Sequence, residues 1–493
     1  MLFNSIPFLI FFPIVTFLYF LIPHRWRWLL LLSASIFFYM AFVPAYILIL
    51  GILILIDYLA GLGMEQVRPE RKKIFLIISI LATCLVLFFF KYFDFFAVNV
   101  NTLAHFLHWN YSLSFLRIAL PLGLSFHTFQ SLSYVIEVYR GQQKAERHLG
   151  LYALYVMFYP QLVAGPIERP QHLLPQLKTL QTFEYHRVTR GLQRMLWGMF
   201  KKIIIADRLA FFVGAVFDHP GDFSGLSLIM AAIYFAIQIY ADFSGYVDIA
   251  LGSAQVMGMQ LTENFRQPYL ARSVGEFWRR WHITLSSWLR DYIFTPLAFR
   301  WRSWKILGMV MAAMVTFAIA GIWHGANWTF VLFGLLHGLA ISAELLTEDV
   351  RKKMAPKING FLWKMAGNVY TFGFWCFSLI FFRAKSMADA FYIVSHLFTG
   401  LGAYLRQIFH YTGKVGSGLL TPFLAGQHRE DFLIVTTAVL LFILIDFLEM
   451  KNNGINLMDR PPTWLRWSAY YALFFGILFF GVFNKTPFIY FQF

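Results

Sequence analysis

Long apolar stretches alternate with short polar and basic stretches along almost the whole chain. Apolar stretches of about 18 residues or more are candidates for membrane-spanning helices. A window of about 19 residues predicts about eleven such spans. Clear examples are Ile6–Ile22, Ile74–Phe90, Ile306–Ile322, Phe330–Leu346 and Phe432–Phe447. The pattern therefore predicts an all-α integral membrane protein.

The sequence contains no repeat and no soluble segment of domain size. We expect one integral membrane domain over residues 1–493. Within it, residues 1–119 carry N-terminal spans, 120–350 form the catalytic core and 351–493 carry C-terminal spans. The first apolar segment lacks a basic leader and a small-residue cleavage site, so it is predicted to be a retained span and not a signal peptide.

Composition supports the membrane assignment. The chain is 59% hydrophobic and 13% charged, whereas soluble proteins carry about 25% charged residues. The net charge of +16 would favour nucleic-acid binding in a soluble protein. In a membrane protein it is explained by short cytoplasmic loops that collect Lys and Arg, so no nucleic-acid partner is expected.

The basic stretches also predict an orientation. His24–Arg27 and Arg68–Lys73 follow the first and third spans and should be cytoplasmic, which places the N-terminus outside. Val98–Ser114 contains no Lys or Arg and suits the outer face. Leu151–Ala164 is too short for a span and is predicted to be re-entrant. Gln171–Lys202 is predicted to form an amphipathic helix on the cytoplasmic face.

One stretch gathers unusual charge, namely GEFWRRWHITLSSWLRDYIF from Gly275 to Phe294. If Glu276–Phe294 forms one helix, two adjacent stripes result. The first is Trp278, Trp281, His282, Leu285 and Leu289, and the second is Arg279, His282, Ser286 and Arg290. Ionisable groups inside a membrane are functional candidates. An interfacial helix with snorkelling arginines is the alternative.

A second candidate site is the segment AGIWHGANWTF. Gly321 and Gly325 lie close to His324 and allow close approach of backbone or ligand. Asn327 could hydrogen-bond an imidazole and fix its tautomer. A desolvated histidine suits general-base catalysis near neutral pH, although His324 could also merely cap its helix. His127 and His337 are expected to be core residues.

Other chemistries are poorly supported. The sequence lacks zinc-binding histidine spacing, a G-x-S-x-G elbow and a P-loop, so no metal site is expected. Cys84 and Cys376 lie in apolar stretches and are interpreted as buried small residues. Asp242 and Asp248 in DFSGYVD are six residues apart, and structural contacts between spans explain them at least as well as catalysis.

Six stretches together resemble bacterial membrane-bound O-acyltransferases (MBOAT) of the alginate O-acetyltransferase type. They are LPLGLSFHTFQSLSYVIEVYRG, FYPQLVAGPIERPQHLLPQ, YADFSGYVDIALGSAQVMG, ENFRQPYLARSVGEFWRRWHITLSSWLRDYIFTPLA, GIWHGANWTFVLFGLLHG and PFIYFQF. The resemblance implies the MBOAT fold, in which tilted spans, re-entrant helices and amphipathic helices surround a central tunnel. It places the family's invariant histidine at His324 and its second functional position at His282.

The resemblance also implies the chemistry. His324 would deprotonate an acceptor hydroxyl, and His282, with Ser286 or Arg290 nearby, would stabilise the developing oxyanion or hold the thioester. Arg279, Arg280 and Arg290 would bind the phosphates of acetyl-CoA. Trp323 and Asn327 complete the expected substrate-binding set. Acetyl-CoA is a donor substrate, and no cofactor is expected.

The expected function is transfer of acetyl groups from cytoplasmic acetyl-CoA across the bacterial inner membrane, for O-acetylation of an exported polysaccharide such as alginate. The expected partner is a periplasmic or membrane-anchored SGNH-type acetyltransferase, because the outer stretch Val98–Ser114 is too short to orient a polymer. O-acetylation of peptidoglycan or another cell-wall polymer is one alternative. A non-catalytic transporter of acyl groups or acyl sugars is another, since broken helices and intramembrane polar groups also fit transporters.

Overall fold

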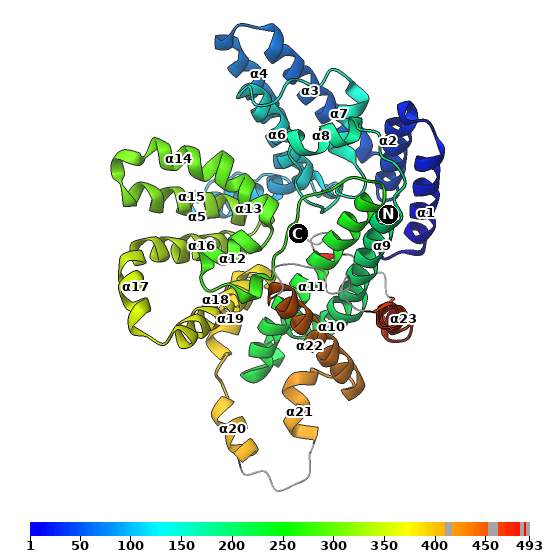
Figure 1. The fold of residues 1–493 in the computed structure, drawn as a ribbon. Coiled ribbons are helices and arrows are strands. Elements are labelled where there is room, and N and C mark those ends of the chain that lie inside the picture. The colour runs from blue at the N-terminus through cyan, green and yellow to red at the C-terminus, as the bar shows by residue number, and fades with distance from the viewer. Residues whose placement is uncertain (410–416, 452–461, 484–487, 490–493) are drawn as a thin grey trace. The chain divides into compact units, whose positions relative to one another are not determined.

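The computed structural model describes residues 1–409, 417–451, 462–483 and 488–489 (Figure 1). All of the regular structure in these ranges is helical, which confirms the all-α prediction. The α-helices before the charge-rich stretch are α1 (Ile6–Leu21), α2 (His24–Met40), α3 (Tyr46–Gln66), α4 (Pro69–Leu87), α5 (Phe93–Phe106), α6 (Leu124–Tyr139), α7 (Leu149–Met157), α8 (Pro170–Lys178), α9 (Tyr185–Phe200), α10 (Asp207–Asp218) and α11 (Leu226–Val256).

The remaining α-helices are α12 (Val274–Arg280), α13 (Ile283–Leu289), α14 (Thr295–Arg300), α15 (Ile306–His324), α16 (Trp328–Leu346), α17 (Glu348–Met354), α18 (Gly360–Arg383), α19 (Met387–His396), α20 (Leu401–Phe409), α21 (Ser417–Leu424), α22 (Arg429–Lys451) and α23 (Thr463–Phe480). Three π-helical stretches join neighbouring helices, namely η1 (Phe88–Tyr92), η2 (Lys201–Ala206) and η5 (Arg290–Phe294). Short 3-10 turns occupy Pro220–Asp222, Pro268–Leu270, Arg302–Trp304 and Ala355–Lys357.

Seven helices in the described residues are long and apolar enough to cross a membrane. They are Tyr46–Gln66, Pro69–Phe106, Leu226–Val256, Ile306–His324, Trp328–Leu346, Gly360–Arg383 and Arg429–Lys451. The sequence-based count of about eleven also included shorter apolar helices, such as α1 and α6 with 16 residues each. The protein is therefore a multi-pass membrane protein.

The chain forms two compact units. Among the described residues, the first comprises 1–196 and 246–263, and the second comprises 197–245 and those described between 264 and 489. In the first unit an aromatic core joins distant segments: the ring of Phe3 lies 4.7 Å from that of Tyr246, and Phe38 lies 5.8 Å from Tyr159.

The predicted re-entrant segment is a short helix followed by irregular backbone. Helix α7 has only nine residues, and residues 152 and 154–167 after its first turn are buried in the first unit. The fully buried Glu168 holds this region together. Its carboxylate accepts hydrogen bonds from the Thr262 backbone N–H and from Nδ1 of His172, the latter at 2.6 Å. Irregular backbone at membrane depth requires such burial within protein.

The basic segment Gln171–Lys202 is divided into α8, α9 and the start of η2. The segment was predicted to form one amphipathic helix on the cytoplasmic face, but it is divided and its last two lysines are buried. Lys202 is only 1% exposed and forms ion pairs with Asp242 at 2.6 Å and Asp207 at 2.8 Å. Lys201 is buried as well and donates to the Ser244 hydroxyl at 2.9 Å.

Arg194 also has acidic partners in the first unit, with N–O distances of 2.9 Å to Asp248 and 2.6 Å to Glu263. Asp242, paired with Lys202 in the second unit, and Asp248 therefore both make ion pairs. These ion pairs favour structural contacts as the explanation for the acids of DFSGYVD.

Helices α15 and α16 form an antiparallel pair in the second unit (Figure 1). Glycines permit their close approach. A Cβ atom on Gly321 would lie 2.3 Å from the Phe330 carbonyl oxygen, and one on Gly334 would lie 2.3 Å from that of Phe317. Both distances are far below van der Waals contact, so the crossing requires glycine at these positions. This pair carries His324 at the end of α15.

Candidate active site

The charge-rich stretch is not one helix. Helix α12 ends at Arg280, and α13 begins at Ile283. His282 lies at the break with φ 43° and ψ 54°, in the left-handed region. Residues other than glycine rarely adopt this conformation, so the surrounding structure must impose it. The prediction of a continuous helix over Glu276–Phe294, with His282 in two stripes, is therefore wrong.

Asn264 fixes the backbone after the break. Its main-chain carbonyl accepts a hydrogen bond from the Ile283 N–H at 3.0 Å. Its side-chain Oδ1 accepts from the Thr284 N–H at 3.0 Å and from the Thr284 hydroxyl at 2.7 Å. The first N–H groups of a helix lack acceptors within that helix. Asn264 supplies acceptors for two of these N–H groups in α13. Favourable contacts there compensate for the strained backbone of His282.

Helix α16 anchors the other end of α12. The Glu344 carboxylate accepts hydrogen bonds from the backbone N–H groups of Val274 at 2.6 Å and Gly275 at 3.0 Å. A negative charge at a helix N-terminus is favourable because the helix dipole is positive there. One residue of α16 therefore fixes where α12 begins.

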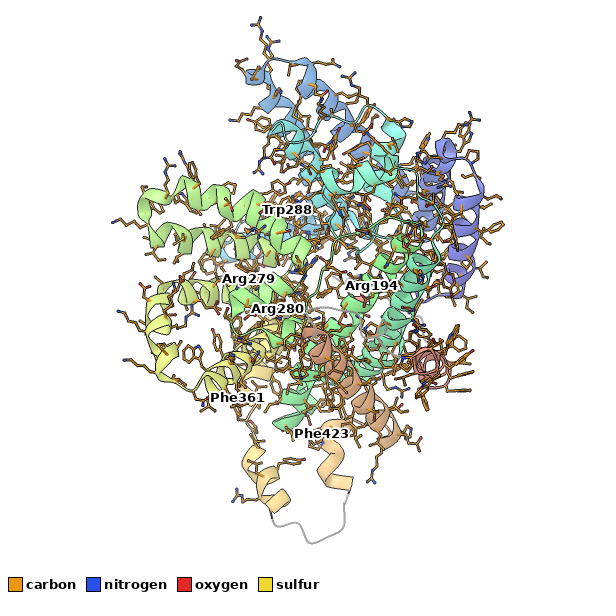
Figure 2. The ribbon with its side chains drawn as sticks, viewed as in Figure 1. Arg194, Arg279, Arg280, Trp288, Phe361 and Phe423 are labelled. Atoms are coloured by element: carbon orange, nitrogen blue, oxygen red, sulfur yellow. The ribbon has the colours of Figure 1, made fainter. Side chains whose placement is uncertain are left out.

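The break between α12 and α13 disrupts the predicted stripe of Arg279, His282, Ser286 and Arg290. Figure 2 labels Arg279 and Arg280 on α12. Arg279 is exposed, and Arg280 pairs with Glu276 at 2.7 Å. The Ser286 hydroxyl donates to the Trp281 carbonyl at 3.1 Å. Arg290 is exposed and pairs with Asp291 at 2.9 Å. Since His282 is completely buried, no continuous line of donors runs from Arg279 through His282 to Arg290.

His282 is buried against aromatic side chains. Its ring meets the ring of Phe243 edge-on, with centroids 4.8 Å apart, and that of Trp323 with centroids 6.3 Å apart. Burial lowers the pKa of His282 to about 3, because a charged imidazole loses its hydration there. The side chain is therefore neutral at physiological pH. A neutral imidazole can donate one hydrogen bond and accept another.

His324 occupies a neighbouring aromatic environment. It is the last residue of α15 and is 5% exposed. Its ring contacts those of Trp323, Phe382 and Phe333 at centroid distances of 4.9, 5.1 and 5.9 Å. The indole of Trp323 thus contacts the rings of both His282 and His324. The structure brings together the two predicted histidines and one predicted tryptophan, although they come from separate segments.

Asn327 has a capping role that sequence reasoning did not assign. Its Oδ1 accepts from the Thr329 N–H at 3.0 Å, as the N-cap of α16. Its Nδ2 donates to the Lys385 carbonyl at 3.2 Å. Gly325 permits the tight turn between α15 and α16, because a Cβ there would lie 2.2 Å from the Phe330 ring. These contacts fix the backbone on the C-terminal side of His324.

His337 is a core residue, as predicted. It is 1% exposed, and its Nδ1 accepts a hydrogen bond from the indole N–H of Trp278 at 3.1 Å. Its Nε2 lies 3.1 Å from the Ser378 hydroxyl. His127 is also buried, which agrees with its predicted core role. No periodic pattern along the chain indicated the contact of α12 with α16 or the role of Asn264.

Three residues define what the site could do chemically, namely His282 at the break between α12 and α13, and Trp323 and His324 at the end of α15. Two buried imidazoles lie beside one indole, and basic side chains lie on the same helix that leads to His282. No group of three or more His, Cys, Asp or Glu side chains suited to a metal ion is found in the described ranges. Neutral histidines are suited to proton transfer and hydrogen bonding.

Comparison with known proteins identifies the family. The sequence model of the membrane-bound O-acyltransferase family (MBOAT) matches residues 147–387 of the chain. The chain is 31% identical to a peptidoglycan O-acetyltransferase of Helicobacter pylori, over 96% of this chain and 92% of that protein. The chain belongs to the membrane-bound O-acyltransferase family. The protein is therefore an O-acyltransferase.

Other MBOAT relatives differ in their acceptors. The chain is 35% identical to the probable alginate O-acetylase AlgI of Pseudomonas aeruginosa, over 81% of this chain and 75% of that protein. It is 26% identical to a teichoic acid D-alanyltransferase of Bacillus subtilis, over 54% of this chain and 69% of that protein. The matched family region contains both His282 and His324.

Proposed function

We propose that this O-acyltransferase is an acetyltransferase of the bacterial inner membrane. It takes acetyl groups from cytoplasmic acetyl-CoA and passes them across the membrane for O-acetylation of an exported polysaccharide. Relatives that match most of the chain are named for peptidoglycan O-acetylation and alginate O-acetylation. Both names combine an acetyl group with a polysaccharide acceptor, which supports the same combination here.

One observation of the structure carries the chemical part of the proposal. His282 and His324 are both buried, and both contact the indole ring of Trp323. A water-poor, aromatic environment strengthens hydrogen bonds to developing charge. It also protects a thioester from hydrolysis. Two imidazoles in such a place suit a reaction that needs a base and a hydrogen-bonding group.

In the proposed reaction His324 is the general base. It accepts the proton of the acceptor hydroxyl, whose oxygen attacks the carbonyl carbon of the thioester. The carbon–sulfur bond then breaks, and the proton passes to the CoA sulfur, which leaves as a thiol. His282, buried and neutral, holds or stabilises the thioester carbonyl. Acid–base catalysis of this kind contributes about 10²- to 10⁴-fold.

The donor is proposed to bind near α12. Arg279 is exposed on this helix and Arg280 is partly exposed (Figure 2). Arginine binds phosphate oxygens through paired N–H groups, and acetyl-CoA carries several phosphates. Arg290 is exposed as well and is a third candidate for the same anion. Trp323 supplies the aromatic wall for the acetyl group.

The acceptor polymer distinguishes two versions of the proposal. Alginate and peptidoglycan are the polymers named for the two relatives described above that match most of the chain. The peptidoglycan relative matches 96% of this chain and the alginate relative 81%, so peptidoglycan is a specific second candidate. Deletion of the gene, followed by measurement of ester-linked acetate on each purified polymer, decides between them.

A partner protein is proposed to complete the transfer. The stretch Val98–Ser114, predicted to be external, includes the end of α5 and the exposed residues 107–112. Too few residues are present there to bind and orient a polymer. A periplasmic or membrane-anchored SGNH-type acetyltransferase would receive the acetyl group and deliver it. Photocrosslinking groups placed at Trp109 and Tyr111, both exposed, should capture this partner.

The experiment that tests the function uses proteoliposomes with radiolabelled acetyl-CoA. The protein and its partner should move label onto the polymer, and His324→Ala should abolish this transfer while its insertion and abundance remain normal. A transporter of acyl groups, the alternative from another class, would instead move label across the membrane in the His324→Ala variant too. Normal polymer acetylation by that variant would remove His324 from the reaction.

A further inference from the structure

The thioester carbonyl needs a hydrogen-bond donor when its oxygen becomes negatively charged. The sequence offered Ser286 and Arg290 as donors beside His282. In the structure the Ser286 hydroxyl already donates to the Trp281 carbonyl, and Arg290 is exposed and paired with Asp291. The residues that hold the backbone of His282 in place supply a different candidate. This candidate depends on the acetyl transfer proposed above.

Asn264 presents an unused donor in the buried site. Its side chain is completely buried. The Thr284 backbone N–H can only donate, so the atom of Asn264 that faces it at 3.0 Å must be the oxygen. The amide nitrogen Nδ2 therefore points away from Thr284. Among the described residues Nδ2 is buried and has no hydrogen-bond acceptor.

A buried amide nitrogen without an acceptor is unusual in a folded protein, because most buried polar groups have a partner. Leaving it unpaired costs folding stability. The side-chain amide oxygen of Asn264 accepts two hydrogen bonds from Thr284, and its main-chain carbonyl accepts a third from the Ile283 N–H, so the place and orientation of the amide are defined. Its donor is thus rigid, buried and available, which is what stabilisation of a developing charge requires.

Ring contacts place Asn264 beside the surroundings of His282. The ring of the next residue, Phe265, lies 5.0 Å from that of Phe243 and 5.0 Å from that of Trp281. Phe243 is the residue whose ring contacts His282. Asn264 also holds the two residues that follow His282. The amide and the imidazole therefore belong to one buried cluster of side chains, although they are 18 positions apart in the sequence.

We propose that Nδ2 of Asn264 donates a hydrogen bond to the oxygen of the thioester carbonyl during acetyl transfer. As the acceptor oxygen bonds to the carbonyl carbon, the carbonyl π electrons move onto this oxygen, and the amide N–H stabilises the charge. The charge returns to form the new ester carbonyl when the carbon–sulfur bond breaks, and the CoA sulfur leaves with the proton. Asn264 neither gains nor loses a proton.

Two variants and a control test this role in proteoliposomes with acetyl-CoA. Asn264→Asp keeps an oxygen for Thr284 but lacks the N–H donor, and Asn264→Ala removes both. Each should lower kcat about 100- to 1,000-fold, the loss expected for one oxyanion donor. KM for acetyl-CoA should change less than threefold. Thr284→Val removes one hydrogen bond to the same amide oxygen and should retain kcat within about threefold if the amide acts through its N–H.

Several outcomes overturn the inference. A kcat of Asn264→Ala within tenfold of the unaltered protein does so, as does an equal loss in Thr284→Val, which would indicate that Asn264 only positions His282. Thermal unfolding in detergent checks that Asn264→Asp remains folded. If the unaltered protein itself transfers no acetyl group, the proposed function fails, whereas an active protein with an active Asn264→Ala variant refutes only the role of Asn264.

Discussion

The indole N–H of Trp278 donates a hydrogen bond to Nδ1 of His337 at 3.1 Å. This contact determines the tautomer of the histidine, because the nitrogen that accepts carries no proton. The proton must then be on Nε2, which donates to the Ser378 hydroxyl at 3.1 Å. Ser378 in turn donates to the Trp375 carbonyl at 2.8 Å. A directed chain of hydrogen bonds thus links α12 to α16 and α18.

Because both nitrogens of His337 are used within this chain, we predict a structural role for it. His337→Ala should lower stability by about 1–3 kcal/mol from the buried indole N–H that loses its acceptor, with a further loss from the cavity. Acetyl transfer per folded molecule should stay within about tenfold of normal, far above the level left after loss of a general base. Thermal unfolding in detergent and transfer in proteoliposomes measure the two effects.

Ser378→Ala is the matched control for His337. It removes one end of the hydrogen-bond chain but leaves the bond between Trp278 and His337 intact, so its effect on stability should be smaller. A His337→Ala protein with normal stability and no transfer activity would contradict the structural role and add His337 to the reaction.

Hydropathy predicted the fold class because the membrane imposes it. A chain in hydrocarbon must satisfy its backbone hydrogen bonds internally, so apolar stretches such as Ile306–Ile322 become helices. The structure has this helix as Ile306–His324. Polar segments were harder to predict. Lys202 belongs to a basic stretch in the sequence, yet it is buried between Asp242 and Asp207, because tertiary partners stabilise a charge that local patterning assigns to the surface.

In the candidate site, too, some features were predicted from the sequence and others were not. The motifs indicated His282 and His324, and the structure brings both into contact with Trp323. The helical stripe around His282 was wrong because periodicity cannot anticipate a left-handed residue. Asn264, which lies 18 positions earlier, holds the two residues after His282 through hydrogen bonds that no periodic pattern encodes. Polar contacts between residues far apart in the sequence were therefore not predicted.

The burial of His282 predicts a dependence of stability on pH. Its pKa in the folded protein is lowered by burial to about 3, from an ordinary value of 6.5. Between these pH values the unfolded chain binds a proton that the folded protein excludes. Stability is therefore full above about pH 6.5 and falls towards acid pH, by up to about 1.4 kcal/mol per pH unit from this residue.

Thermal unfolding from pH 7.5 to pH 4.5 measures this effect, with His282→Asn as the comparison. The variant lacks the titrating group, so its unfolding temperature should fall less steeply with decreasing pH than that of the unaltered protein. If the unfolding temperatures of the two proteins fell equally with decreasing pH, the prediction that folding excludes a proton from His282 would be wrong.

The basic side chains of α12 predict an effect on the donor. Replacing both Arg279 and Arg280 with Ala should raise KM for acetyl-CoA by about tenfold or more, because each charged hydrogen bond to phosphate contributes about 1.5–3 kcal/mol. The kcat should change little, since these side chains are separate from the buried histidines. Initial rates at varied acetyl-CoA concentrations separate the two constants.

Arg302→Ala is the control for the loss of positive charge. Arg302 is exposed in the next basic cluster and donates only weakly, to the Phe299 carbonyl at 3.3 Å. Its KM should remain close to normal. An unchanged KM in the double variant, or an equal rise in Arg302→Ala, would place the CoA phosphates elsewhere.

The last prediction concerns the buried Lys202, which holds Asp242 at 2.6 Å and Asp207 at 2.8 Å with all three side chains at most 3% exposed. Lys202→Met should destabilise the protein by about 3–5 kcal/mol, because it leaves buried carboxylates without a cation. Asp242 also accepts the Ile489 N–H at 2.6 Å, so the same change should loosen the C-terminal segment and increase its cleavage by proteases. Lys352→Met provides the contrast, since the pair of Lys352 and Glu348 is exposed and exposed pairs contribute little. Equal unfolding temperatures for the two variants would show that the buried pair contributes no more to stability than the exposed one.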